Sequence, residues 1–130
     1  MKIKILEINF QKKNKIVVYF SCTIGEGIGV WKSQDKVYKG MEADVELDVY
    51  GTLSVNEDIN LVEEQEEKIY IMDNQVHIRG RIEQIDWDNL ITVRLGRSIL
   101  LIDVDDVAFL GINKWIDIKT KELGLTEVIF

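Results

Sequence analysis

The sequence contains no proline and a single cysteine, and the absence of proline leaves glycine and asparagine to make the turns. One thiol, Cys22, cannot close an intramolecular disulfide, so a disulfide-stapled secreted scaffold is excluded and a buried free thiol is the simplest interpretation. No stretch reaches the run of about 18 apolar residues that a membrane-spanning helix needs, and no apolar signal-peptide core follows the N-terminal lysines. We therefore expect a cytoplasmic protein that does not contact a membrane.

Histidine is nearly absent as well, which limits the chemistry that the chain can perform. His77 stands alone, so a histidine-based zinc site cannot be built, and no nucleophile motif accompanies it. Because it is out of phase with Val76 and Ile78, we expect His77 on the surface. The acidic clusters at 86–88 and 103–106 lack the glycine and closing glutamate of an EF-hand loop, so we interpret them as solvated turns. The sequence predicts a non-enzyme without a metal or cofactor.

Positive charge is also in short supply. The 16 lysines and arginines face 23 aspartates and glutamates, which gives a net charge of −7 and a pI near 4.7. Such a surface repels phosphate backbones and favours basic partners, so the composition argues against nucleic acid as the partner. All the arginines lie in the second half of the chain, where an anion-holding patch is therefore more favoured. They are Arg79, Arg81, Arg94 and Arg97.

What the sequence does contain is a repeated pattern. Residues 40–49 combine a glycine with an alternating strand, followed by Leu53 and an acidic-apolar pair, and residues 111–119 with Leu123 repeat the same order. This repetition predicts two similar small β units in tandem.

Two predicted hairpins support the duplication. Residues 2–10 alternate in polarity but shift register at Leu6, which indicates a β-bulge, and a polar turn at 11–14 leads into a second strand. Residues 76–85 and 91–95 repeat this design, and aligning Asn14 with Asn89 superposes the two hairpins without a gap. Each half therefore has about five strands.

The segments between the hairpins and the repeated strands differ. Gly25–Gly29 carries three glycines at every second position, which favours a flexible or closely approached loop, and it lacks the following helix of a phosphate-binding loop. Residues 61–68 are a plausible helical turn or an exposed connector. We place a boundary there, which divides the chain into units 1–66 and 67–130. The predicted fold is all-β, either two tandem OB-like or SH3-like barrels or one β-sandwich.

The leading functional hypothesis is a non-enzymatic module that binds another protein through an acidic surface dotted with aromatic residues. Its most concrete version is a bacterial immunity-type inhibitor that covers the cationic cleft of a basic toxin domain, such as a nuclease. The alternative is an OB-type module for nucleic acid or oligosaccharide, with the four arginines forming its groove. The residues expected to bind the partner protein are Trp31, Glu46, Asp48, Asp86, Trp87 and Asp88.

Overall fold

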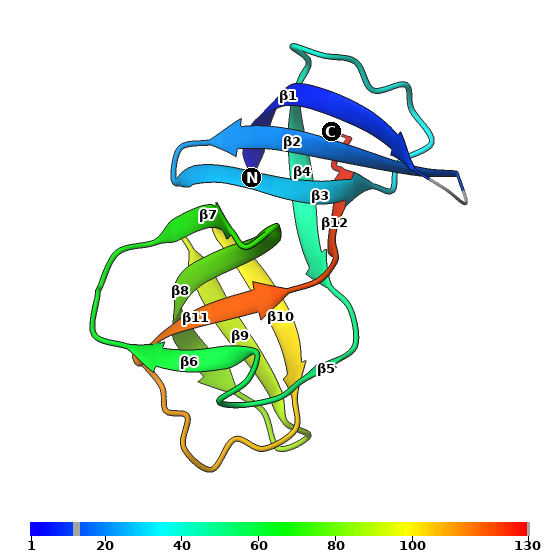
Figure 1. Cartoon of the computed structure of the whole chain (residues 1–130). Helices are drawn as coiled ribbons and strands as arrows, with labels where there is room; N and C mark the ends of the chain where they lie inside the picture. The colour runs from blue at the N-terminus through cyan, green and yellow to red at the C-terminus, as the bar shows by residue number, and fades with distance from the viewer. Residues whose placement is uncertain (12–13, 130) are drawn as a thin grey trace.

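The computed structural model describes residues 1–11 and 14–129, and in these ranges the chain forms twelve strands and no α-helix (Figure 1). No helix in these ranges is therefore long and apolar enough to cross a membrane. Lys12 and Lys13, in the predicted turn of the first hairpin, lie outside the described residues. The strands are β1 (Lys2–Gln11), β2 (Lys15–Cys22), β3 (Gly25–Trp31), β4 (Glu42–Val49), β5 (Thr52–Leu53), β6 (Ile59–Val62), β7 (Lys68–Met72), β8 (Gln75–Ile85), β9 (Leu90–Leu95), β10 (Ser98–Val104), β11 (Trp115–Thr120) and β12 (Leu123–Glu127).

Five of these strands close into a β-barrel. β1, β2 and β3 form an antiparallel meander, and β4 returns to pair antiparallel with β1. The last strand, β12, completes the barrel, because it pairs antiparallel with β4 and parallel with β3. In Figure 1, β12 accordingly leaves the lower part of the molecule and enters the upper lobe beside β3 and β4.

The remaining strands form the lower lobe of Figure 1. β8, β9 and β10 make a second antiparallel meander, and β11 returns to pair with β8. Two short strands from the first half join them: β5 pairs parallel with β10, and β6 pairs antiparallel with β11. β7 pairs with β8 and reaches β3 at one position, which links the two lobes.

Strict alternation positions the core. On β4, Ala43, Val45 and Leu47 are buried, whereas Glu42, Asp44 and Glu46 between them are exposed. The register of β1 against β2 shifts between Ile5 and Glu7, which confirms the bulge predicted at Leu6. Before the bulge Ile3 and Ile5 are buried; after it Ile8 is partly buried against the core, whereas Phe10 is 83 % exposed.

Several turns between strands contain an asparagine with a positive φ angle. Asn14 and Asn89 both adopt positive φ, 59° and 64°, at matching places in the two hairpins. Asp73 and Asn74 do the same between β7 and β8. Asparagine and aspartate adopt the left-handed backbone conformation more readily than other non-glycine residues do. Their presence between two predicted strands therefore indicates a turn.

The all-β class and a barrel are confirmed, but two local interpretations were wrong. Gly25–Gly29 is the start of β3 rather than a loop, because the glycines let neighbours approach closely. A Cβ on Gly27 would lie 2.6 Å from the Phe20 ring, and one on Gly29 would lie 2.7 Å from the Leu125 side chain. Residues 61–68 contain no helical turn: they end β6, cross an exposed stretch and begin β7.

The predicted boundary near residue 66 falls in this exposed stretch. Strands from the two halves of the chain nevertheless pair with each other. β12 of the second half lies between β3 and β4 of the first, and β5 and β6 of the first half pair with β10 and β11 of the second. The division into units 1–66 and 67–130 stays a prediction. A test of it must ask whether each half folds without the strands that it receives from the other half.

Candidate functional site

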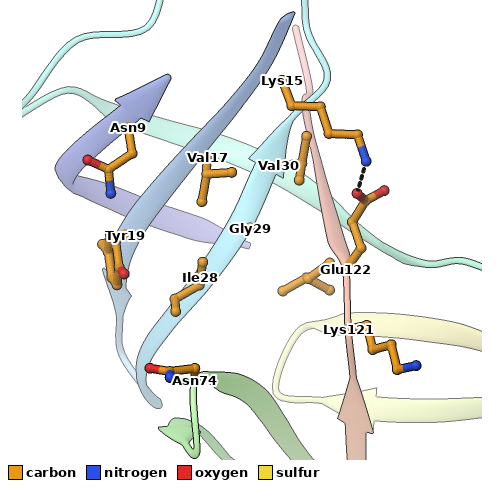
Figure 2. Close-up of a pocket in the computed structure, with 11 residues that line it drawn as sticks. Asn9, Lys15, Val17, Tyr19, Ile28, Gly29, Val30, Asn74, Lys121 and Glu122 are labelled. Carbon is orange, nitrogen blue, oxygen red and sulfur yellow. Dashed lines mark hydrogen bonds and ion pairs between the residues drawn. The ribbon is translucent and has the colours of Figure 1, made fainter. Parts of the chain in front are cut away.

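A pocket of about 330 Å³ opens on the outer face of β2 and β3. Its floor contains Val17 and Val30, which are register partners across these strands (Figure 2). Strand alternation turns both side chains away from the barrel interior, where Val18 and Phe20 pack, yet both are less than a tenth exposed. The outer face is therefore sheltered enough at this place to hold a ligand on an apolar floor.

Polar side chains from four separate segments surround this floor. Asn9 comes from β1, Lys15 from β2, and Asn74 from the turn between β7 and β8. Lys121 and Glu122 come from the connection between β11 and β12, which crosses from one lobe to the other. Figure 2 shows these side chains around Val17, Ile28 and Val30, with Tyr19 beside them.

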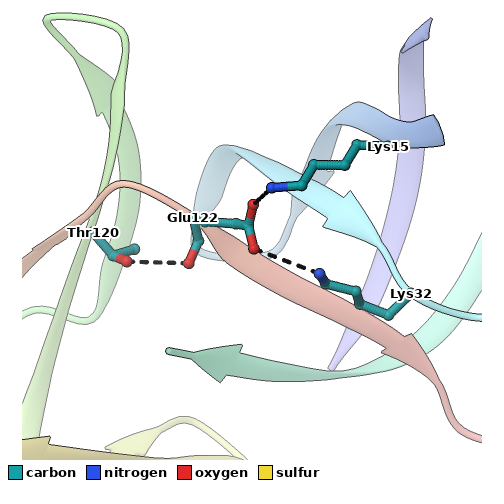
Figure 3. A network of polar contacts seen from close by, with 4 residues as sticks. All are labelled: Lys15, Lys32, Thr120 and Glu122. Atoms are coloured by element: carbon teal, nitrogen blue, oxygen red, sulfur yellow. Dashed lines mark hydrogen bonds and ion pairs between the residues drawn. The ribbon is translucent and has the colours of Figure 1, made fainter. Parts of the chain in front are cut away.

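Glu122 is the centre of an ion-pair network at the rim (Figure 3). Its carboxylate accepts a hydrogen bond of 2.6 Å from the Lys15 ammonium and one of 3.5 Å from the Lys32 ammonium. The hydrogen bond from Lys15 and the charge of Lys32 lower the pKa of Glu122 below its ordinary value, against the opposing effect of partial burial. The main-chain oxygen of Glu122 accepts a bond of 3.1 Å from the Thr120 hydroxyl, which fixes the connection independently of the carboxylate.

A second pocket, of about 380 Å³, lies on the other side of the same connection and shares Lys121 and Glu122 with the first. Tyr50, which is half exposed, lines it. The Lys32 ammonium lies 5.1 Å from the centre of the Tyr50 ring, within the range of a cation–π contact. We call the two pockets, together with the connection whose residues line both, the junction groove.

The junction groove brings together apolar, aromatic and charged side chains. Val17, Ile28 and Val30 form an apolar floor in the first pocket, and Tyr19 and Tyr50 lie along the groove. The charged residues that line it are Lys15, Lys119, Lys121, Glu57, Asp58 and Glu122. Lys32 joins them through its contacts with Glu122 and Tyr50. Lysines and carboxylates are therefore nearly balanced in the groove, on a protein whose net charge is −7. Among the described residues, no group of three or more histidine, cysteine or acidic side chains is placed to hold a metal ion.

The four arginines do not line the junction groove. Arg79, Arg81 and Arg94 lie on the outer face of β8 and β9, as the alternation predicts, but each has a partner within the chain. Arg79 binds Asp117 at 3.3 Å and Arg81 binds the Asn113 side chain at 2.8 Å. Arg94 forms a two-oxygen ion pair with Glu83, with contacts of 2.9 and 3.1 Å. Arg97 lines a different pocket, beside the N-terminus.

His77 is buried, so the expectation of a surface position was wrong. It does point away from Val76 and Ile78, but neighbours on β7 and β11 cover it. Its ring stacks on Tyr70 with centroids 4.9 Å apart, and its Nδ1 lies 3.4 Å from a carboxylate oxygen of Asp117. Burial and a 2.7 Å hydrogen bond to Asp117 raise the pKa of Tyr70 to about 12. This cluster ties β7, β8 and β11 together.

The six residues expected to bind a partner protein do not form one surface. Trp31 is only 5 % exposed, because it lies on the inward face of β3, and its indole N–H donates to the main-chain oxygen of Asp35. That placement removes its ring from any contact surface. Glu46 and Asp48 do point outward from β4, where they share a shallow depression with Ile99 and Leu101 of β10.

Asp86, Trp87 and Asp88 occupy the turn between β8 and β9. Trp87 is 96 % exposed, so its ring lies in solvent. Asp86 is partly buried and accepts a hydrogen bond from the Gln84 side chain, and Asp88 is exposed. The turn and the outer face of β4 are separate candidates for contact with a protein.

Sequence reasoning missed Lys32, Lys121 and Glu122. The only local signal for the groove was the positively charged segment that ends at Lys15. Glu122 is 107 residues away from Lys15 and 90 from Lys32, so no pattern within one strand could join them. The pairing of β12 with β3 and β4 brings them together.

Comparison with known proteins adds no relative, since no protein-family model, no curated protein and no solved structure matches the chain. Evidence about function therefore comes from the geometry alone.

Proposed function

We propose that the chain consists of two OB-type units that exchange their fifth strands, and that it binds a short single-stranded nucleic acid in the junction groove. The connectivity supports the first part. A meander of three strands, a fourth that returns to the first and a fifth that closes the barrel make the five-stranded Greek-key barrel of OB type. In the upper lobe β12 is that fifth strand. In the lower lobe the segment with β5 and β6 takes the same place between β10 and β11.

The observation that carries the ligand assignment is the position of the junction groove. OB units bind oligonucleotides and oligosaccharides on the face of their second and third strands, between the first and fourth connecting loops. The pocket on β2 and β3 lies on this face, and Lys121 and Glu122 precede the fifth strand as the fourth loop does.

In the first pocket, where Lys15 and Lys121 line the wall with the single carboxylate of Glu122, the side chains favour an anionic ligand over a neutral sugar. Lysine ammonium groups bind phosphate, and the exposed rings of Tyr19 and Tyr50 can stack on bases. Because the protein carries a net charge of −7, phosphates outside the groove are repelled, so the bound segment is short.

The test is a fluorescence anisotropy titration with a labelled oligothymidine of about 12 nucleotides at low salt. Contact with roughly three phosphates gives a slope of about −2 for log affinity against log salt. We expect Lys15→Gln to weaken binding and Lys114→Gln, a matched change on an exposed loop, to leave it unchanged. Lack of binding at low salt refutes the assignment, and salt-independent binding of neutral oligosaccharides would replace it with a sugar ligand.

The acidic surface supports a second candidate function, the binding of a basic protein. The observation in its favour is that Trp87, almost fully exposed, stands between Asp86 and Asp88 in a tight turn. An exposed tryptophan flanked by carboxylates suits a hot spot that faces a cationic surface, including that of a toxin nuclease.

A pull-down from lysate tests this second candidate. A partner that binds through the turn is lost when Asp86→Lys and Asp88→Lys are combined, and its affinity decreases as salt rises. A partner that tolerates both the double variant and high salt contradicts this interpretation of the turn.

A further inference from the structure

We propose that Glu122 determines the affinity and selectivity of the junction groove, because its carboxylate occupies the position of a ligand phosphate between Lys15 and Lys32. This inference rests on the proposed function and deepens it.

The geometry places an anion where a ligand anion is expected. The Glu122 carboxylate is held by one ammonium from β2 and another at the end of β3, at 2.6 and 3.5 Å. A carboxylate and a phosphate both present negatively charged acceptor oxygens, and both form charge-assisted hydrogen bonds with ammonium groups. The same two lysines cannot serve both anions fully.

The network is accessible to a ligand. About a third of the side-chain surface is exposed in Glu122 and Lys32, and about half in Lys15. Ion pairs with this exposure contribute little to stability, so an incoming phosphate can displace the carboxylate at small cost. While the carboxylate stays in place, it repels phosphate.

Removing the carboxylate leaves the groove intact. The connection is held by the Thr120 hydroxyl on the main-chain oxygen of Glu122, and by the pairing of Leu123 with Val49. None of these contacts uses the Glu122 side chain. A neutral residue at this position frees both lysines without displacing the strand that carries it.

The selectivity follows from charge. A wild-type groove with the carboxylate in place discriminates against weakly held single phosphates and admits oligomers that contact several lysines at once. It also tolerates neutral groups. We therefore expect the side chain at position 122 to set the balance between neutral and anionic ligands.

The experiment compares Glu122→Gln with wild type in anisotropy titrations of labelled oligothymidine across a range of salt. Gln has the same shape and no charge. We expect binding at least fivefold tighter, which corresponds to an exposed ion pair of about 1 kcal/mol. The salt slope is expected to steepen by about 0.7 for each lysine that gains a phosphate.

Glu42→Gln is the matched control. It also removes one negative charge and one exposed ion pair, with Lys2 at 3.9 Å, but Glu42 lies outside the junction groove. We expect less than a twofold change from it. Adding Lys15→Gln and Lys32→Gln to Glu122→Gln is expected to abolish the gain.

Each outcome decides something. If wild type binds and Glu122→Gln binds no more tightly than Glu42→Gln, the inference is overturned and the proposed function stands. If neither wild type nor Glu122→Gln binds at low salt, the proposed function and the inference both fail. Urea unfolding of each variant checks folding, and Glu122→Ala, which must give the same direction of change, replaces Glu122→Gln if that variant does not fold.

Discussion

Separating the chain at the exposed stretch after residue 66 should unfold both halves, because each lobe depends on strands from the other half. Fragment 1–66 lacks β12, whose Leu123 and Leu125 are at most 1 % exposed in the intact chain. Burying one leucine contributes about 1.5–3 kcal/mol, so the fragment loses roughly 3–6 kcal/mol, besides the hydrogen bonds to β3 and β4. A unit of this size has a total stability of roughly 3–10 kcal/mol.

The assay is urea unfolding followed by circular dichroism, with amide NMR spectra of each fragment. We expect no cooperative transition for fragment 1–66 or fragment 67–130 alone, and recovery of a folded complex when they are mixed. A repaired fragment, in which residues 1–50 are joined directly to 121–129, should fold alone, since Leu123 pairs with Val49 and a short turn can connect them. Cooperative unfolding of fragment 1–66 near the midpoint of the full chain would refute the strand exchange as a requirement for folding.

Four further substitutions test individual side chains. Trp31→Ala should destabilise the protein by about 3–5 kcal/mol in urea unfolding, whereas Trp87→Ala should change stability by less than about 0.5 kcal/mol, since the first ring is buried and the second is in solvent. With a pKa of about 12 in the folded protein against 10 in the unfolded chain, Tyr70 should reduce stability as pH rises from 10 to 12, and Tyr70→Phe should remove this loss and the late step of the alkaline absorbance titration. Asp117→Asn should cost about 1–3 kcal/mol of unfolding free energy, because it weakens the acceptor for Tyr70 and leaves the mostly buried Arg79 without its counter-ion.

The placement of His77 shows that the pattern of a single strand predicts which face a residue lies on but not whether that face is buried. Alternation correctly put it opposite Val76 and Ile78, but the outer face of β8 is covered by Tyr70 of β7 and Asp117 of β11. The same limit applies to the outer face of β2, where Val17 is buried beneath the junction groove. A strand pattern predicts which side a residue faces, but what packs against that side depends on other segments.

Local physics determined the β class, the bulge at Leu6 and the asparagine turns, because each depends on a few neighbouring residues and their backbone preferences. The alternation of β4 and of β11 could be read for the same reason, whereas the tandem repeat inferred from it stays a prediction. The tertiary structure alone decided that β12 closes the first barrel and that Lys15, Lys32 and Glu122 meet. Backbone hydrogen bonds are chemically alike in all strands, so a strand's own sequence seldom identifies its neighbours, and a groove made by distant segments exists only once those neighbours are chosen.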